Sequence, residues 1–162
     1  MIRNANIDDA AAICGIYNHY VEKTIITFEE QPVSADEMQS RIKEVTAVYP
    51  WLVWEDAGII AGYAYAGQWK SRRSFRHTVE STVYLAPGAT GRGMGRQLYA
   101  GLIDALRDRG IHSVIGGISL PNPASVALHE KMGFEKIGHF KEVGWKFNQW
   151  IDVGYWELIL HP

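Results

Sequence analysis

The stretch that decides the fold is HTVESTVYLAPGATGRGMGRQLYAGLIDALRDRG, residues 77–110. Its first part, 77–85, alternates between two faces and is rich in β-branched and aromatic side chains, which predicts a strand. A glycine-rich turn follows from Pro87 to Gly95. Apolar residues then recur at the spacing of a helix that ends at Gly110: Leu98, Leu102, Ile103 and Leu106. The stretch therefore predicts a strand, a turn and a helix in that order.

Outside this stretch, helix caps and apolar periodicity predict three more helices. They run from Asp8 or Asp9 to about Glu22, from Ser34 to about Val48, and from Asn122-Pro123 to Gly133. Runs of aromatic and β-branched residues predict further strands at 51–54, 59–66, 113–118 and, as a pair, within 134–160. This order of elements predicts a mixed α/β sheet domain.

Length and composition indicate one soluble domain that spans residues 1–162. The chain is 47% hydrophobic and 12% aromatic, which is enough for one ordinary core and excludes disorder. A net charge of -2 argues against nucleic acid and anionic membranes as partners, and no apolar run approaches the roughly 18 residues that cross a bilayer. Cys14 is the single cysteine, which excludes an internal disulfide and fits a reducing compartment. We therefore expect a cytoplasmic protein.

The turn Thr90-Gly91-Arg92-Gly93-Met94-Gly95-Arg96 is a candidate phosphate site. It lies at the predicted start of a helix, where backbone N–H groups and the helix dipole attract anions. A Walker-type loop needs Lys and then Ser or Thr after its last glycine, and a dinucleotide-binding turn needs glycine where Arg96 stands. A Walker-type nucleotide site and a dinucleotide-binding site are therefore both disfavoured. A flexible surface turn is the alternative.

This turn resembles the pyrophosphate loop of the GCN5-related N-acetyltransferases (GNAT), in which small residues stand where Gly93 and Gly95 stand here. Thr90 departs from the usual Gln or Arg of that loop. Asn122-Pro123-Ala124-Ser125, with Gly133-Phe134 after it, resembles the second coenzyme A segment of the superfamily. The resemblance implies a single-domain GNAT fold with a central mixed, mostly antiparallel sheet, acetyl-CoA as co-substrate, and no metal. It implies these coenzyme-binding residues: Val83, Tyr84, Leu85, Gly91, Arg92, Gly93, Met94, Gly95, Arg96, Asn122 and Lys131.

Four segments resemble the phosphinothricin acetyltransferase subfamily: Val79-Glu80-Ser81-Thr82-Val83-Tyr84, Leu120-Pro121-Asn122-Pro123, His129-Glu130, and Trp150 with Asp152-Val153-Gly154. This resemblance covers nearly the whole chain. It implies transfer of an acetyl group, by direct attack in a ternary complex, to the α-amine of a small amino acid analogue. Phosphinothricin, methionine sulfoximine and methionine sulfone are the expected substrate types, with herbicide or antibiotic resistance as the expected consequence. The subfamily also implies a homodimer.

Glu80 is the first catalytic candidate, because an ammonium substrate must lose a proton before it attacks. Alternation places Glu80 on one strand face with Thr82 and Tyr84. If that face lines a pocket, burial raises the carboxyl pKa toward the range of a general base. The resemblance gives Glu80 the same role, acting through water. A solvated strand glutamate is the alternative reading.

His129 is the second catalytic candidate. It shares a helix face with Ser125 and Met132, where a histidine is by itself more typical of a satisfied core residue. The subfamily resemblance implies a second proton-transfer residue, which either assists the base or returns a proton to the thiolate. By analogy with the superfamily, backbone N–H groups at Tyr84 to Leu85 are expected to bind the thioester carbonyl.

The run Lys70 to Arg76 carries four positive charges within seven positions. Such runs are often solvated faces, but guanidinium and ammonium groups beside aromatic walls also suit a small carboxylate substrate. Matching to the subfamily favours Lys70 and Arg72 as anchors and these residues as walls: Phe28, Trp69, Phe75 and Tyr84. We expect Arg73 and Arg76 to face solvent.

Two other functions fit parts of the pattern. A ribosomal-protein or peptide N-terminal acetyltransferase needs an open groove, which the basic run argues against. A non-catalytic coenzyme A-binding module would keep the glycine turn and Asn122 without chemistry, which the joint presence of Glu80 and His129 disfavours. The late aromatic residues could belong to the core, the pocket or a dimer interface: Trp145, Phe147, Trp150 and Trp156.

Overall fold

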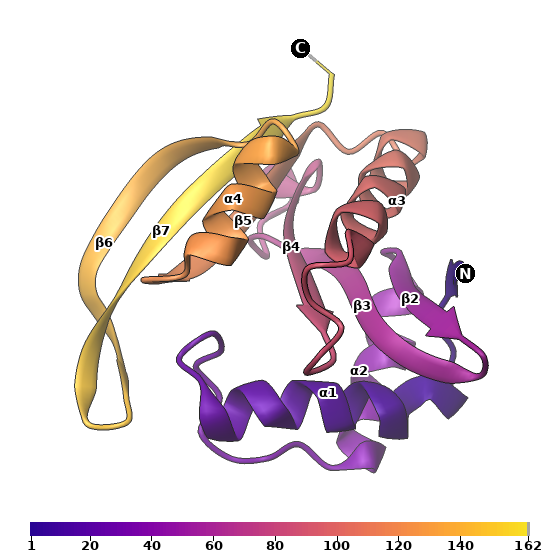
Figure 1. Ribbon diagram of the computed structural model, residues 1–162. Helices are drawn as coiled ribbons and strands as arrows, with labels where there is room; N and C mark the ends of the chain where they lie inside the picture. Colours follow the sequence, from indigo (N-terminus) through magenta and orange to yellow (C-terminus); the bar gives the residue numbers. More distant parts are fainter. Residues whose placement is uncertain (162) are drawn as a thin grey trace.

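The computed structural model describes residues 1–161, in which seven strands form one sheet with helices on both faces (Figure 1). The spatial order is β1-β2-β3-β4-β5-β7-β6, and only the β4–β5 pair is parallel. The strands are β1 (Ile2–Asn4), β2 (Trp51–Asp56), β3 (Ile59–Gln68), β4 (Thr78–Leu85), β5 (Ser113–Leu120), β6 (Glu135–Lys146) and β7 (Gln149–Ile159). The predicted α/β class with a mixed, mostly antiparallel sheet is confirmed.

Four helices complete the described part of the fold: α1 (Ala10–Lys23), α2 (Ala35–Thr46), α3 (Met94–Asp108) and α4 (Pro123–Lys131). Helix α2 begins after the N-cap Ser34, and α4 begins after the N-cap Asn122 with Pro123 in its first turn, both as predicted. Gly133 follows α4 with a φ of 90°, a left-handed conformation that ends the helix. None of these helices is long and apolar enough to span a membrane.

Strand alternation divides the core into two clusters. Leu52, Ala64 and Val79 face α3, and their neighbours Val53 and Tyr63 face α1 and α2. Successive side chains of a strand point to opposite faces, so one sheet supports both layers. Figure 1 shows the result: α1 and α2 lie below the first half of the sheet, and α3 lies above it.

The two halves of the sheet meet along a short parallel contact. Strands β4 and β5 pair only from Thr78 to Glu80 with Ser113 to Ile115. Beyond Glu80, β4 stays with β3 and β5 stays with β7 along their lengths. The two central strands therefore diverge, and one edge of β4 is left without a strand partner.

The N-terminus differs from its prediction in two respects. Strand β1, from Ile2 to Asn4, was not predicted, because three residues are too few to show a periodicity. The helix cap is Asn6, whose side chain accepts the Asp8 N–H and begins a 3-10 turn that leads into α1. Asp9 instead accepts two hydrogen bonds from Arg3, each 2.8 Å long. Asp9 does occupy the N-cap position of α1, as predicted, but its side chain makes no capping hydrogen bond to that helix.

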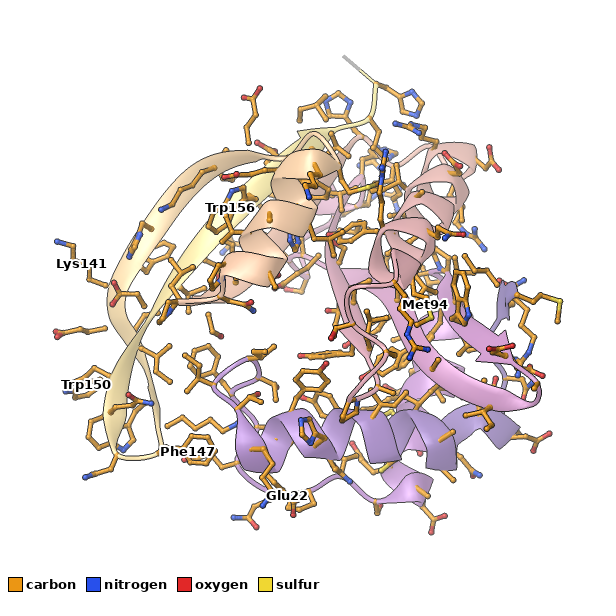
Figure 2. The ribbon with its side chains drawn as sticks, in the orientation of Figure 1. Glu22, Met94, Lys141, Phe147, Trp150 and Trp156 are labelled. Atoms are coloured by element: carbon orange, nitrogen blue, oxygen red, sulfur yellow. The ribbon has the colours of Figure 1, made fainter. Side chains whose placement is uncertain are left out.

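Trp156 gives a test of how tightly the second half of the sheet is packed (Figure 2). A Cβ at Gly154 would lie 2.5 Å from Cζ3 of this buried ring, whereas a Cβ at Gly138 on β6 would meet nothing within 4 Å. We predict that Gly154→Ala lowers the free energy of unfolding by about 1–3 kcal/mol through overpacking. Gly138→Ala, the matched control, should change it by less than about 0.5 kcal/mol. Urea titration measures both, and equal losses would contradict this packing.

Candidate active site

The glycine turn presents backbone N–H groups at the start of α3. Gly91 and Gly93 have φ values of 78° and 76°, which side-chain-bearing residues rarely adopt. Gly93 is the N-cap of α3 and offers no capping side chain, so the first N–H groups of the helix have no side-chain acceptor there. Such a helix start binds anions through its free N–H groups and its dipole.

Two adjoining pockets run from this turn to the divergence of β4 and β5. The first, which we call the coenzyme pocket after the role predicted for its residues, includes Gly91, Gly93, Gly95, Arg96 and Lys131 in its lining. The second, which we call the catalytic pocket after the roles predicted for Glu80 and His129, is lined by these two residues and their neighbours. The two pockets share five lining residues and therefore meet: Ile26, Val83, Tyr84, Asn122 and Ser125.

Most of the predicted coenzyme-binding residues lie in this lining, but two side chains do not. Met94 points into the core, where it is buried, and Arg92 is exposed outside both pockets. Asn122 uses its side-chain oxygen to cap α4, accepting the Ser125 N–H at 3.2 Å. Any role of Met94 in phosphate binding would thus rest on its backbone N–H, not on its side chain.

The unpaired edge of β4 supplies further backbone donors. The Ala86 N–H binds the Ala61 carbonyl at 2.8 Å, which fixes the phase of the β3–β4 ladder. By alternation, the Tyr84 N–H then faces β3, and the N–H groups of Val83 and Leu85 face the divergence. Tyr20 donates its hydroxyl to the Leu85 carbonyl at 2.6 Å on the same edge. The N–H groups of Tyr84 and Leu85 were predicted to bind the thioester carbonyl. Of these two, only the Leu85 N–H is directed toward the space between β4 and β5.

Glu80 lies at the last paired position of β4, with its carboxylate in the catalytic pocket. Burial raises the pKa of the Glu80 carboxyl above its ordinary value, and the Lys70 ammonium partly opposes that rise. A Cβ at Gly117 would lie 3.2 Å from both Glu80 Oε1 and the Tyr155 ring, so glycine leaves room for both. These features suit a carboxylate that accepts a proton from a bound molecule.

His129 lies on the other side of β5 and ends a buried chain of hydrogen bonds. Its Nδ1 lies 2.7 Å from the Ser125 carbonyl oxygen, and its Nε2 lies 3.1 Å from the Tyr99 hydroxyl, which also bonds the Ser81 hydroxyl. A carbonyl can only accept, so Nδ1 carries the proton and Nε2 accepts from Tyr99. Burial lowers the pKa of the His129 imidazole, which favours this neutral form. Proton transfer by His129 stays a prediction, and it requires one of these bonds to break.

Gly116 makes the position of His129 possible. A Cβ there would lie 2.5 Å from His129 Nε2. Because Gly116 and Gly117 are consecutive in a strand, they leave space on opposite faces of β5, one for His129 and one for Glu80.

The predicted substrate residues separate into two groups. Phe28 and Tyr84 line the catalytic pocket. Outside that lining are Trp69, Lys70, Arg72 and Phe75. Trp69 nevertheless packs edge-on against Tyr155 with ring centroids 5.8 Å apart, and the Lys70 ammonium lies 4.8 Å from the centroid of the Trp69 ring. Trp69 and Lys70 therefore lie beside Tyr155, near the pocket that holds Glu80. All four cations of the run are exposed: Lys70, Arg72, Arg73 and Arg76.

Several residues that line the pockets or contact lining residues were not found from the sequence. Tyr20, Thr27, Ser81 and Gly117 line a pocket, and Tyr99, Gly116 and Tyr155 lie against residues of the site. The two consecutive glycines inside a predicted strand were a usable signal, since glycine weakens a strand and often marks close approach. The hydroxyl residues gave no such signal. Among residues 1–161, no group of three or more His, Cys, Asp or Glu side chains could hold a metal ion.

A family model described as "Acetyltransferase (GNAT) domain" matches residues 2–154. The chain belongs to the GNAT family. The predicted assignment to an acetyl-CoA-dependent N-acetyltransferase is thereby confirmed.

Known GNAT proteins resemble the chain over nearly its full length. Phosphinothricin N-acetyltransferase from Streptomyces viridochromogenes is 41% identical over 96% of this chain and 85% of its own length. The L-amino acid N-acyltransferase MnaT from Escherichia coli is 43% identical over 98% of this chain and 93% of its own length. The structure of yncA from Salmonella typhimurium, a putative acetyltransferase with its cofactor acetyl-CoA, has a TM-score of 0.98 at 39% identity, covering 100% of this chain and 94% of that one.

Gly93 tests the coenzyme pocket of this GNAT protein. Gly93→Val would place a branched side chain in the pocket lining, at a left-handed φ. We predict that its dissociation constant for acetyl-CoA rises at least tenfold, or about 1.4 kcal/mol, by calorimetry. Gly88→Val is the matched control, because Gly88 has a similar φ of 82° but does not line the pocket. Unchanged acetyl-CoA affinity in a folded Gly93→Val protein would refute the assignment of the turn.

Proposed function

We propose that the protein transfers the acetyl group of acetyl-CoA to the α-amine of a small amino acid analogue of the phosphinothricin, methionine sulfoximine or methionine sulfone type. The observation that carries the proposal is the position of Glu80, whose carboxyl pKa is raised by burial in a pocket that adjoins the coenzyme pocket. The names of the similar proteins support this substrate class.

Acetyl-CoA, when bound, supplies the acetyl group as an activated thioester, so the protein must bind, orient and move protons. The Glu80 carboxylate accepts the proton of the substrate ammonium, directly or through one water. The free amine nitrogen then forms the C–N bond as the C–S bond breaks. The nitrogen loses its surplus proton to become an amide, and one proton passes to the departing thiolate sulfur. The Leu85 N–H faces the gap where the carbonyl oxygen gains charge, which suits a stabilising donor. The start of α3 suits the pyrophosphate.

The basic run at the rim supports a substrate with a carboxylate. Lys70 lowers the pKa of Glu80 and is therefore close enough to attract an anion beside it. Arg72 follows in an exposed segment next to the 3-10 turn Arg73–Phe75. We assign Lys70 and Arg72 to the substrate carboxylate and Trp69 and Phe75 to the walls around it.

We further propose that the enzyme is a homodimer in the cytoplasm and confers resistance to toxic amino acid analogues. Apolar side chains stand exposed along the β6–β7 hairpin: Phe140, Val143, Trp145, Phe147 and Trp150. A second copy of the chain would cover this apolar surface, and sedimentation equilibrium tests that. Cys14 is buried as a free thiol, which fits a reducing compartment.

Release of free coenzyme A from purified protein tests the proposed reaction. The panel consists of phosphinothricin, methionine sulfoximine, methionine sulfone, the ordinary amino acids and short peptides. We expect turnover with the first three and little with peptides. Preference for peptides would favour a peptide N-terminal acetyltransferase, and no turnover with any amine would favour a coenzyme A-binding module.

We predict that Glu80→Gln lowers kcat by about 100-fold or more while acetyl-CoA affinity is kept, because the amide preserves shape without basicity. In the parent protein kcat/KM should fall as pH drops through the raised pKa of Glu80, because only the ionised carboxylate accepts a proton. The variant should lose this acidic limb and recover rate as pH approaches the pKa of the amine. Steady-state kinetics across pH measures both, with exposed Glu22→Gln as the control. Near-normal kcat for Glu80→Gln would remove Glu80 from the base role.

For Arg72→Ala we predict that KM for the carboxylate-bearing amine rises about tenfold, while kcat and acetyl-CoA affinity stay nearly unchanged. The proposed ion pair between the Arg72 guanidinium and the substrate carboxylate is present in both the ground state and the transition state, so its loss weakens binding without slowing the chemical step. Arg73→Ala is the matched control from the same exposed run. The comparison uses each amino acid analogue and its decarboxylated amine. Equal losses for both amines would contradict a carboxylate anchor.

A further inference from the structure

Lys146 is a buried cation without a part in the proposed reaction. It is 1% exposed although it lies at the end of β6, next to the tip of the β6–β7 hairpin. Its ammonium donates to the Thr27 carbonyl at 2.7 Å and lies 3.5 Å from the Tyr20 carbonyl, with the Phe147 ring centroid at 5.0 Å. Figure 2 shows Phe147 beside the C-terminal end of α1, where the hairpin tip meets the following segment.

Burying an ammonium group is costly unless its donors are used. Burial lowers the pKa of Lys146, and the Glu30 carboxylate attracts the ammonium and partly opposes that effect. The shortest contact of Lys146 is with a backbone carbonyl, so its charge fixes a main-chain position. That position belongs to Thr27, which lines the catalytic pocket together with Ile26 and Phe28.

A second contact joins the same strand to the same segment. Phe28 packs directly on Gly144, where an added Cβ would overlap the phenyl ring. Gly144 and Lys146 are two residues apart on β6 and thus lie on the same side of the strand. Lys146 thus contacts the Thr27 carbonyl and Gly144 contacts the Phe28 ring, and both contacted residues line the pocket that contains Glu80.

Other contacts hold the two ends of this segment. Thr24 donates its hydroxyl to the Tyr20 carbonyl at 2.8 Å, and the Val33 N–H binds the Asn18 side chain at 2.8 Å. Glu29 accepts two hydrogen bonds from Arg41 of α2. Within 26–28, the Ile26 N–H donates to the Thr24 hydroxyl at 3.1 Å, and the Tyr17 hydroxyl bonds the Thr27 hydroxyl at 2.8 Å. The groups that the hairpin contacts are the Thr27 carbonyl and the Phe28 ring.

We propose that Lys146 is a positioning residue that fixes the Ile26–Phe28 wall of the amine site by binding the Thr27 carbonyl, so that the β6–β7 hairpin sets the geometry of substrate binding. This inference rests on the proposed function for its kinetic consequence. Whether Lys146 orders residues 26–28 can be measured without any substrate.

Lys146→Met tests the inference, because methionine keeps the apolar stem and removes the charged donor. We expect KM for the amine to rise about tenfold, KM for acetyl-CoA to stay within twofold, and amide hydrogen exchange of residues 26–28 to accelerate at least tenfold relative to β4. Lys146→Arg, which keeps a cation, should restore both readings to within about threefold. Lys141→Met is the matched control, since Lys141 points outward from the same strand (Figure 2).

The inference is overturned if folded Lys146→Met shows an unchanged KM for the amine and unchanged hydrogen exchange at residues 26–28. It is also overturned if KM rises equally for the amine and for acetyl-CoA and hydrogen exchange accelerates uniformly across the sheet. Lys146→Gln, which keeps a neutral donor, replaces Lys146→Met if that protein does not fold, and the same outcomes decide. The exchange measurement needs no substrate. If the parent protein turns over none of the amines tested, but hydrogen exchange at residues 26–28 is faster in Lys146→Met, the proposed substrate is rejected. The role of Lys146 in ordering residues 26–28 is then retained.

Discussion

The divergence of β4 from β5 after Glu80 is the constraint on which the rest of the site depends. Two parallel strands that stayed paired would satisfy each other's backbone groups and close the sheet. Here the pairing stops at Glu80 and Ile115. The edge of β4 that carries the Val83 and Leu85 N–H groups is therefore free to bind a ligand, and the coenzyme and catalytic pockets meet at this opening.

Gly116 and Gly117 add a second constraint at the same place. A Cβ at Gly116 would clash with His129 at 2.5 Å on one face of β5, and a Cβ at Gly117 would crowd Glu80 and Tyr155 at 3.2 Å on the other. Two consecutive residues without Cβ atoms thus allow functional side chains to approach one strand from both sides. A glycine pair weakens a strand in isolation, and here β7 pairs with β5 along its whole length and compensates.

The part of the site that we assign to the amine is assembled from elements far apart in the chain. Its wall at Ile26–Phe28 comes from the segment between α1 and α2, and its support comes from Gly144 and Lys146 on β6. The β6–β7 hairpin also carries the exposed aromatic residues that we assign to a dimer interface. The dimer that we propose and the substrate-site geometry that we infer would therefore both involve this hairpin.

The sequence by itself determined the order of the helices and strands from α1 onward, the caps at Ser34 and Asn122, and the strand face of Glu80, because caps and periodicity are local properties. The glycine motif at Gly93 and its resemblance to GNAT loops also gave the family. Only the tertiary structure decided which groups meet: the opening at β4, the partners of His129, and the contact of Lys146 with Thr27, 119 residues away. Such contacts depend on the packing of distant segments, and no local pattern encodes which distant carbonyl a lysine will bind.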